Sequence, residues 1–302
     1  MSVSEETIGG HVYERVTMRA GVNVIPLKEN KRAEFVEDIA RQLPQSVLAD
    51  LFSIPTEDRA FFNKCSNIMT GFFGGAVDYN NEVGKQVNDA AISISNYFKE
   101  LIKIKRESPG DDFFSKMLSV QKHFGLSDDE LISQAVMMLV AGQVTTTDQI
   151  CNNFYLLMSR PELLKKIQDQ PELMTTATEE FKRFDPAVTF LFRVATEDSL
   201  LGEQPVKKGD TVFVANHCIN RDEEMFENPN EINIERRQNQ HFAYGHGAHY
   251  CIGARLGRMQ IGILFDTLIK EFPTLKLSSS KSAVRDHYSL SFSGFKQIPV
   301  EI

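Results

Sequence analysis

The feature that most constrains this chain of 302 residues is Cys251, which lies among the glycines Gly245, Gly247 and Gly253. Glycine permits backbone angles and close approaches that a Cβ would forbid, so this loop can fold against something flat and bulky. A helix-like apolar run begins at Ala254, so backbone N–H groups and a helix N-terminus would stabilise a thiolate at Cys251. An axial thiolate ligand of haem iron requires such an environment.

Two other interpretations of this loop stay open. Cys251 with His246 and His249 could form half of a zinc site, but zinc needs four ligands and the only other candidates are His217 and Cys218. We expect those two within a strand or at a strand end. A cysteine in an apolar loop can also be a small buried hydrophobe without a ligand.

Composition excludes several classes of function. The chain is 42% hydrophobic and 25% charged, as globular proteins are, and its net charge of −8 argues against nucleic-acid binding. Four widely spaced cysteines imply no disulfide framework, which favours a reducing cytoplasm. We expect no signal peptide and no membrane span, because neither a basic start followed by an apolar run nor about 18 consecutive apolar residues occurs.

Apolar periodicity predicts a mainly α protein with a small β portion (α+β). Helices are expected over 31–54, with an interruption at Pro44, and over 56–74 and 82–107. A short helix over 113–118 should follow a cap at Asp111 or Asp112. A long helix should run from the capping box Ser127–Glu130 to about Met158, and another should begin at Pro161. The run 136–141 is apolar all round, so we expect that helix to cross the core. Strand-like patterning appears over about 186–216.

Residues 242–258 resemble the cysteine loop of the cytochrome P450 haem-thiolate family, of the soluble bacterial type. The resemblance implies haem b with Cys251 as the axial ligand and a cofactor loop that includes Tyr244, Gly245, Gly247 and Gly253. Tyr244 stands where the family usually has Phe, and Gly257 where it usually has Ala, which costs about 1 kcal/mol of helix preference.

Three more parts of the chain carry the same resemblance. Glu180 and Arg183 match the Glu-x-x-Arg pair, with Arg236 as the later arginine that locks it in a structural role behind the haem. Arg193 and His249 match the partners of the haem propionates, which are carboxylates and favour such bases.

Residues 141–146 resemble the oxygen-binding notch of the family, which implies that Ala141 and Gly142 face the haem and that Thr145 assists proton delivery. Val144 replaces the acid that usually precedes this threonine, and a valine cannot relay protons. Water, Gln143 or a substrate group would then have to compensate.

The resemblance covers residues 32–302 and implies a P450-like domain there, whereas 1–31 form a non-matching segment, too short for the usual N-terminal sheet and first helices. His11 and Arg15 have the spacing of a propionate clamp, but we favour two surface bases. The segment's shortness leaves part of the pocket absent, or supplied by a second chain or partner.

The resemblance implies a monooxygenase that takes electrons from a ferredoxin or flavodoxin and oxidises a small or carrier-bound organic substrate in secondary metabolism. Expected substrate contacts are Val136, Leu139, Val140, Ala187, Val188 and the turn at Leu290. Two alternatives are an enzyme without standard oxygen activation (an isomerase, dehydratase, peroxide-user or nitric-oxide-type reductase) and a shortened non-catalytic member that acts through a partner.

Overall fold

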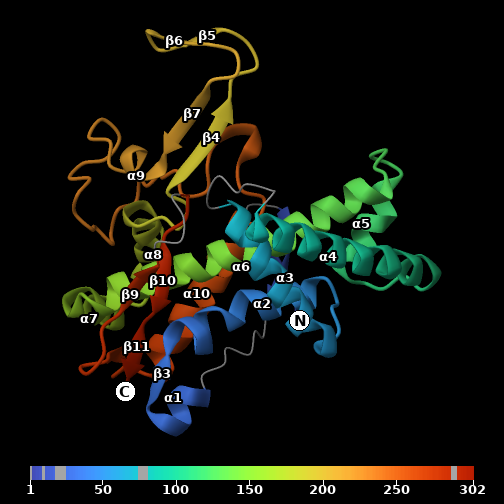
Figure 1. Cartoon of the computed structure of the whole chain (residues 1–302). Helices are drawn as coiled ribbons and strands as arrows, with labels where there is room; N and C mark the ends of the chain where they lie inside the picture. The colour runs from blue at the N-terminus through green and yellow to red at the C-terminus, as the bar shows by residue number, and fades with distance from the viewer. Residues whose placement is uncertain (1, 9–10, 18–24, 74–80, 287–290) are drawn as a thin grey trace.

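The computed structural model describes residues 2–8, 11–17, 25–73, 81–286 and 291–302. Helix α6 (Asp128–Met158) runs through the middle of this part of the chain (Figure 1). Its predicted capping box is confirmed: the amide of Glu130 donates to Ser127 Oγ at 3.2 Å, and the amide of Ser127 donates to the Glu130 carboxylate at 2.8 Å. The helix therefore begins where two local side chains satisfy its free N–H groups.

The other helices are α1 (Ile25–Asn30), α2 (Gln42–Leu51), α3 (Arg59–Phe73), α4 (Glu82–Glu107), α5 (Phe113–Gln121), α7 (Pro161–Asp169), α8 (Leu173–Phe184), α9 (Asn216–Ile219) and α10 (Ala254–Glu271), with single turns at Val36–Ala40, Thr56–Asp58 and Gly247–His249. Most of them lie within the predicted ranges, but α1 and α9 were not predicted, and residues 32–34, expected in a helix, form a strand. Of the two aspartates, Asp112 caps α5. The expected interruption falls at Arg41, so Pro44 lies in the first turn of α2, where its missing N–H costs little.

The strands form small antiparallel sheets. β1 (Ser2–Ile8) pairs with β2 (His11–Thr17); β3 (Arg32–Glu34) and β8 (Lys276–Leu277) flank β11 (Pro299–Glu301); β4 (Phe190–Val194) pairs with β7 (Thr211–Ala215), β5 (Ser199–Leu201) with β6 (Gln204–Val206), and β9 (Val284–Asp286) with β10 (Gly294–Gln297). The predicted mainly α architecture with a small β portion is confirmed.

One local expectation differs from the structure. His217 and Cys218 lie in the short helix α9 rather than at a strand end, because the amide of Asn220 bonds back to the carbonyl of Asn216 and closes a helical turn. His11 and Arg15 lie in strand β2, so their four-residue spacing is not that of one helix face, and the favoured interpretation as two surface bases stays a prediction.

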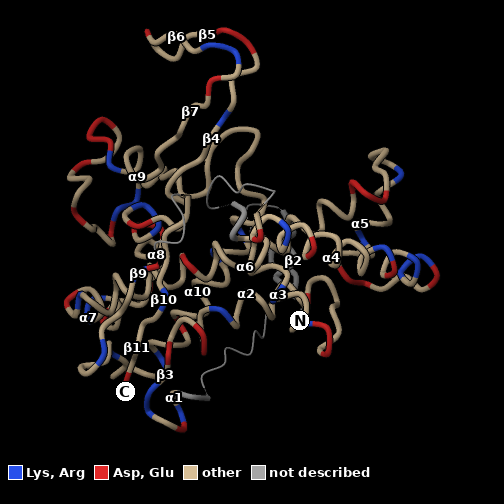
Figure 2. Tube along the Cα trace, viewed as in Figure 1, with Lys and Arg blue, Asp and Glu red and all other residues tan. Residues whose placement is uncertain are grey.

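Helix α6 divides the core into two clusters. Its C-terminal half packs with α8 and α10, where Phe35 stacks on Phe154 with ring centroids 3.6 Å apart. Its N-terminal half packs with α2 to α5. Burial is not complete all round, since Met137 is 50% exposed. Charges of both signs are spread along the helices (Figure 2), and none of the described helices is long and apolar enough to cross a bilayer.

Candidate haem-thiolate site

The Cys251 loop is closed by one backbone hydrogen bond. The amide of Cys251 donates to the carbonyl of Tyr244 at 3.0 Å, which brings the two ends of the loop together. Gly245 and Gly247 adopt φ values of +71° and +73°, which residues with a Cβ rarely adopt. Helix α10 begins directly afterwards at Ala254, with Gly253 at its N-cap. The conformation predicted from the glycines is thus built into the loop.

The sulfur of Cys251 lies at the surface of this loop. Partial burial raises the pKa of the Cys251 thiol above its usual 9.0, while the backbone N–H groups of Gly253 and Ala254 and the charge of Arg258 act in the opposite direction. The residue is exposed, and its neighbour Ile252 is 85% exposed. The loop therefore offers a sulfur and an apolar side chain to whatever lies against it.

The structure brings Glu180, Arg183 and Arg236 together. Both carboxylate oxygens of Glu180 accept from Arg183, at 2.8 and 2.9 Å, and Arg236 Nε donates to the same carboxylate at 3.0 Å. Glu180 and Arg183 are 0% exposed. The remaining donors of Arg183 bond to the carbonyls of residues 220, 229 and 231. The three side chains thus fasten α8 to the loop that precedes Cys251; their role behind a haem stays a prediction.

A second cluster, which sequence reasoning missed, surrounds Glu179. Its carboxylate accepts from Lys182 at 2.6 Å and from Arg258 at 2.9 and 3.0 Å, and it lies 3.2 Å from His241 Nε2. Although burial alone would raise the pKa of Glu179, these partners hold it far below its usual range. Lys182, which is 1% exposed, has its pKa lowered by burial. Only the three-residue spacing of Glu179 and Lys182 is a signal in the sequence.

The two predicted propionate partners lie on exposed positions. Arg193 is in β4, and Nη1 donates to the neighbouring carbonyl of Phe192 at 2.8 Å. His249 ends the turn Gly247–His249 and is exposed. Leu191, which shares a strand face with Arg193, lies 3.7 Å from the Cβ that Gly245 lacks. This face of β4 is therefore next to the Cys251 loop.

Helix α6 supplies the predicted notch residues without a break in the helix. Ala141 is exposed, and Thr145 Oγ1 donates back to the carbonyl of Ala141 at 2.6 Å. Gly142 has a packing role, because a Cβ there would come 2.9 Å from Leu48 Cδ1 on α2. The glycine allows α2 and α6 to approach closely; whether it also faces a haem stays a prediction.

Gln143 is turned away from this stripe of α6. It is 3% exposed, and it lies about 200° around the helix from both Ala141 and Thr145 at 100° per residue. Among the described residues its Oε1 has no hydrogen-bond partner. The idea that Gln143 replaces the acid missing at Val144 is therefore not supported, since its amide points into the core.

The expected substrate contacts on α6 are also core residues. Val136, Leu139 and Val140 are at most 8% exposed and pack with α2 to α5, whereas Met137 lies on the stripe of Ala141. Because residues 136–141 are apolar all round, the sequence does not show which side of α6 the helices α2 to α5 cover. Two further expected contacts are Ala187, which is buried, and Val188, which forms a bridge with Phe292. Leu290 lies outside the described residues.

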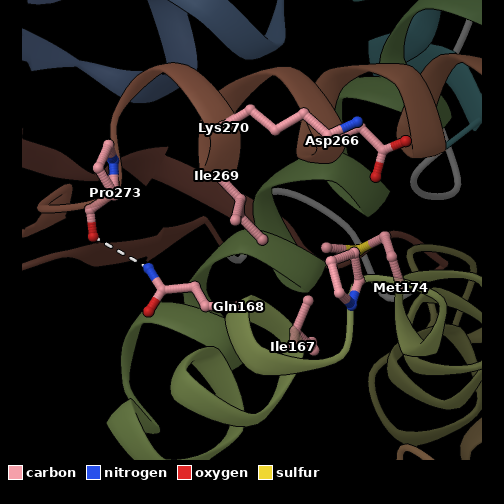
Figure 3. A pocket seen from close by; sticks show the side chains of 8 residues that line it. Ile167, Gln168, Met174, Asp266, Ile269, Lys270 and Pro273 are labelled. Atoms are coloured by element: carbon pink, nitrogen blue, oxygen red, sulfur yellow. Dashed lines mark hydrogen bonds between the residues drawn. The ribbon is translucent and has the colours of Figure 1, made fainter.

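A separate pocket of about 410 Å³ lies between α7, α8 and the C-terminal part of α10 (Figure 3). Gln168 Nε2 closes one end by donating to the carbonyl of Pro273 at 3.0 Å. Ile269 is 15 residues beyond the start of α10, or about 22 Å along the helix axis. This pocket is therefore remote from Cys251 and includes none of the predicted site residues.

The zinc interpretation gains no support. No three His, Cys, Asp or Glu side chains gather into a possible metal site within the described ranges. The four cysteines are free, as the absence of a disulfide pattern predicts.

The comparisons identify the class of protein that this loop and helical fold define. The family model described as "Cytochrome P450" matches residues 31–293, so the chain belongs to the cytochrome P450 family. Members of this family are oxidoreductases that bind haem through a cysteine thiolate.

Particular relatives come from bacteria. The chain is 32% identical to the polyketide biosynthesis cytochrome P450 PksS of Bacillus subtilis, over 91% of this chain and 66% of that protein. It is likewise 32% identical to the mycinamicin IV hydroxylase/epoxidase of Micromonospora griseorubida, over 89% and 66%. The chain therefore spans about two thirds of the length of the curated relatives it matches.

A solved structure shares the fold. P450BioI in complex with an acyl carrier protein bearing hexadec-9Z-enoic acid superposes with a TM-score of 0.86 at 28% identity, over 92% of this chain and 71% of that one.

Proposed function

We propose that this chain is a haem-thiolate monooxygenase that holds haem b through Cys251. The observation that carries the proposal is the Cys251 loop. Its surface sulfur accepts hydrogen bonds from the backbone N–H groups of Gly253 and Ala254, and the neighbouring Ile252 is exposed. Gly247 adds to the fit, because no described atom beyond its own chain neighbours lies within 4 Å of the Cβ it lacks. A flat apolar group can therefore lie against this backbone without a clash.

The residues around the loop fit the other needs of haem. Arg193, on the face of β4 next to the loop, and His249, within the loop, are exposed bases suited to two carboxylates. When bound, haem supplies the redox centre at which dioxygen is activated. The hydroxyl of Thr145 lies on the exposed stripe of α6, where its oxygen can accept a hydrogen bond while its O–H donates one to the carbonyl of Ala141.

The substrate class follows from the relatives. Since two of the matched proteins are named for polyketide and mycinamicin chemistry and a third binds an acyl carrier protein, we extend a small or carrier-bound organic substrate to this chain. A monooxygenase of this kind needs a ferredoxin or flavodoxin as electron donor. We place the reaction in the cytoplasm, where free thiols persist.

A second polypeptide would complete the pocket. Phe192 and Phe213 pair across β4 and β7 and are 58% and 67% exposed, with Phe190 and Val194 on the same face. A two-stranded sheet with an uncovered apolar face is marginal by itself. The mass of the haem-loaded protein in solution tests this: a mass of one chain would exclude a second polypeptide.

A specific observation favours a second function. Val144 cannot relay a proton and Gln143 points into the core, so a haem-thiolate reaction without standard oxygen activation, such as isomerisation or peroxide use, has support from α6. Val144→Glu separates the two. If oxygen-dependent turnover rises in this variant, the monooxygenase scheme holds; if turnover is unchanged, Val144 is not the limiting position.

The binding of haem is tested first. We expect the purified protein, supplied with haem, reduced and treated with carbon monoxide, to show the red-shifted thiolate-type Soret band. Cys251→Ser abolishes this band, whereas Cys218→Ser, a matched change at another exposed cysteine, retains it. Failure of the wild type to take up haem would overturn both functions and favour a non-catalytic member.

A further inference from the structure

Arg258 contacts both flanks of the Cys251 loop. Its Nη1 donates to the hydroxyl of Tyr250 at 3.1 Å, and its guanidinium lies 4.5 Å from the ring centroid of Tyr244. Tyr250 precedes the cysteine directly, and the carbonyl of Tyr244 accepts the amide of Cys251. One side chain on the second turn of α10 thus joins the residues at which the loop begins and ends.

Glu179 fixes the orientation of this side chain. Nε and Nη2 of Arg258 both donate to Glu179 Oε2, at 3.0 and 2.9 Å, which leaves Nη1 directed at Tyr250. The carboxylate is itself held by Lys182, which is almost fully buried. Because the guanidinium is a planar fork, its three hydrogen bonds determine one position, which a lysine ammonium could not reproduce.

We propose that Arg258, oriented by Glu179, is a positioning residue that sets the conformation of the Cys251 loop and thereby the place at which the sulfur is presented to haem. The haem part of this inference rests on the proposed function. The conformation of the loop does not, since every contact named is made by the protein itself.

The test uses four variants. Arg258→Gln removes the fork and the charge, and Arg258→Lys keeps the charge alone. Tyr250→Phe removes one hydrogen bond, so it provides a folded variant if the arginine variants unfold. Lys270→Gln is the matched control, because it removes one positive charge from the exposed far end of the same helix.

Hydrogen exchange of the protein without haem gives the first readout. We expect the amide of Cys251 to exchange about tenfold faster in Arg258→Gln and Arg258→Lys, less so in Tyr250→Phe, and at the wild-type rate in Lys270→Gln. Exchange at the wild-type rate in Arg258→Lys would show that the positive charge is sufficient and that the shape of the guanidinium is not required. Equal exchange in Arg258→Gln and the wild type would overturn the proposal itself.

The reduced carbon monoxide spectrum gives the second readout. In Arg258→Gln and Arg258→Lys we expect the fraction with the thiolate-type band to fall by more than half at equal haem content, and to be unchanged in Lys270→Gln. An unchanged fraction would overturn the haem part of the inference. Absence of haem uptake by the wild type would instead overturn the proposed function, and the exchange experiment would still decide the role of Arg258 in the loop.

Discussion

The side chain of Tyr244 reaches over Gly257: a Cβ at residue 257 would lie 3.4 Å from the Tyr244 hydroxyl oxygen. These are the two positions at which the cysteine segment departs from the residues usual in the family, Phe and Ala. The departures are therefore connected in space, because the residue without a Cβ makes room for the added hydroxyl. Each change alone would look arbitrary in the sequence.

We predict that Tyr244 and Gly257 are coupled in stability. Gly257→Ala should gain about 1 kcal/mol of helix preference in Tyr244→Phe and less in the wild type, because the added Cβ would lie at the near limit of van der Waals contact with the Tyr244 hydroxyl. Urea unfolding of the four proteins measures the coupling. Gly262→Ala on the same helix meets nothing within 4 Å and should gain equally in both backgrounds. Equal gains from Gly257→Ala would contradict the coupling.

A second prediction compares two ion pairs of the same spacing. Glu180–Arg183 and Glu100–Lys103 are both three residues apart at 2.8 Å, but the first is 0% exposed and the second is 69% and 67% exposed. Glu180→Ala should cost about 3–5 kcal/mol of unfolding free energy, because it leaves Arg183 buried without its counter-charge. Glu100→Ala should cost less than about 1 kcal/mol. Similar losses in chemical denaturation would show that burial does not set the difference.

Local chemistry made much of the fold predictable. Ser127, Asp112 and Pro161 mark helix starts through contacts within a few residues, and each is found at the start of a helix. The conformation of the cysteine loop could also be predicted, because each glycine indicates unusual backbone angles at its own position. The family and the helical architecture followed from these segments.

Contacts between distant segments were not predictable in the same way. Glu179 and Arg258 are 79 residues apart, and neither carries a local signal that names the other as its partner. Gln143 and Leu139 were misplaced for a related reason: the apolar run 136–141 does not say which side α2 to α5 cover. The side of a helix that stays open is decided by the elements that pack on it.

The cap of α5 gives a prediction about pH. Burial alone would raise the pKa of Asp112, but hydrogen bonds from Lys105 and Ser115 outweigh it and hold this pKa below its usual 3.8. A carboxyl whose pKa is lower in the folded than in the unfolded protein stabilises the folded state above pH 3.8. This stabilisation is lost as the pH falls through the pKa of the folded state. The loss of unfolding free energy in Asp112→Asn should therefore be largest above about pH 5 and shrink below pH 4.

Urea titrations between pH 3 and 6 check this prediction. Asp111→Asn is the matched control, because Asp111 is next in sequence and its ion pair with Lys116 at 3.0 Å is exposed. It should change the unfolding free energy by less than about 0.5 kcal/mol. A loss in Asp112→Asn that does not vary with pH would show that the aspartate acts only as a neutral cap.

The last prediction concerns Arg193, whose position separates haem retention from folding. Its side chain is exposed and bonds to the adjacent carbonyl of Phe192, so Arg193→Gln should leave the unfolding midpoint of the haem-free protein unchanged. If the guanidinium holds a propionate, haem should dissociate about tenfold faster from the variant, because a charge-assisted hydrogen bond is lost. Transfer of haem to an apo-globin acceptor measures this rate. Lys208→Gln, at another exposed base beyond the β5–β6 hairpin, serves as the control and should release haem at the wild-type rate. Equal rates in Arg193→Gln and the control would show that Arg193 lies beside the Cys251 loop without holding its cofactor.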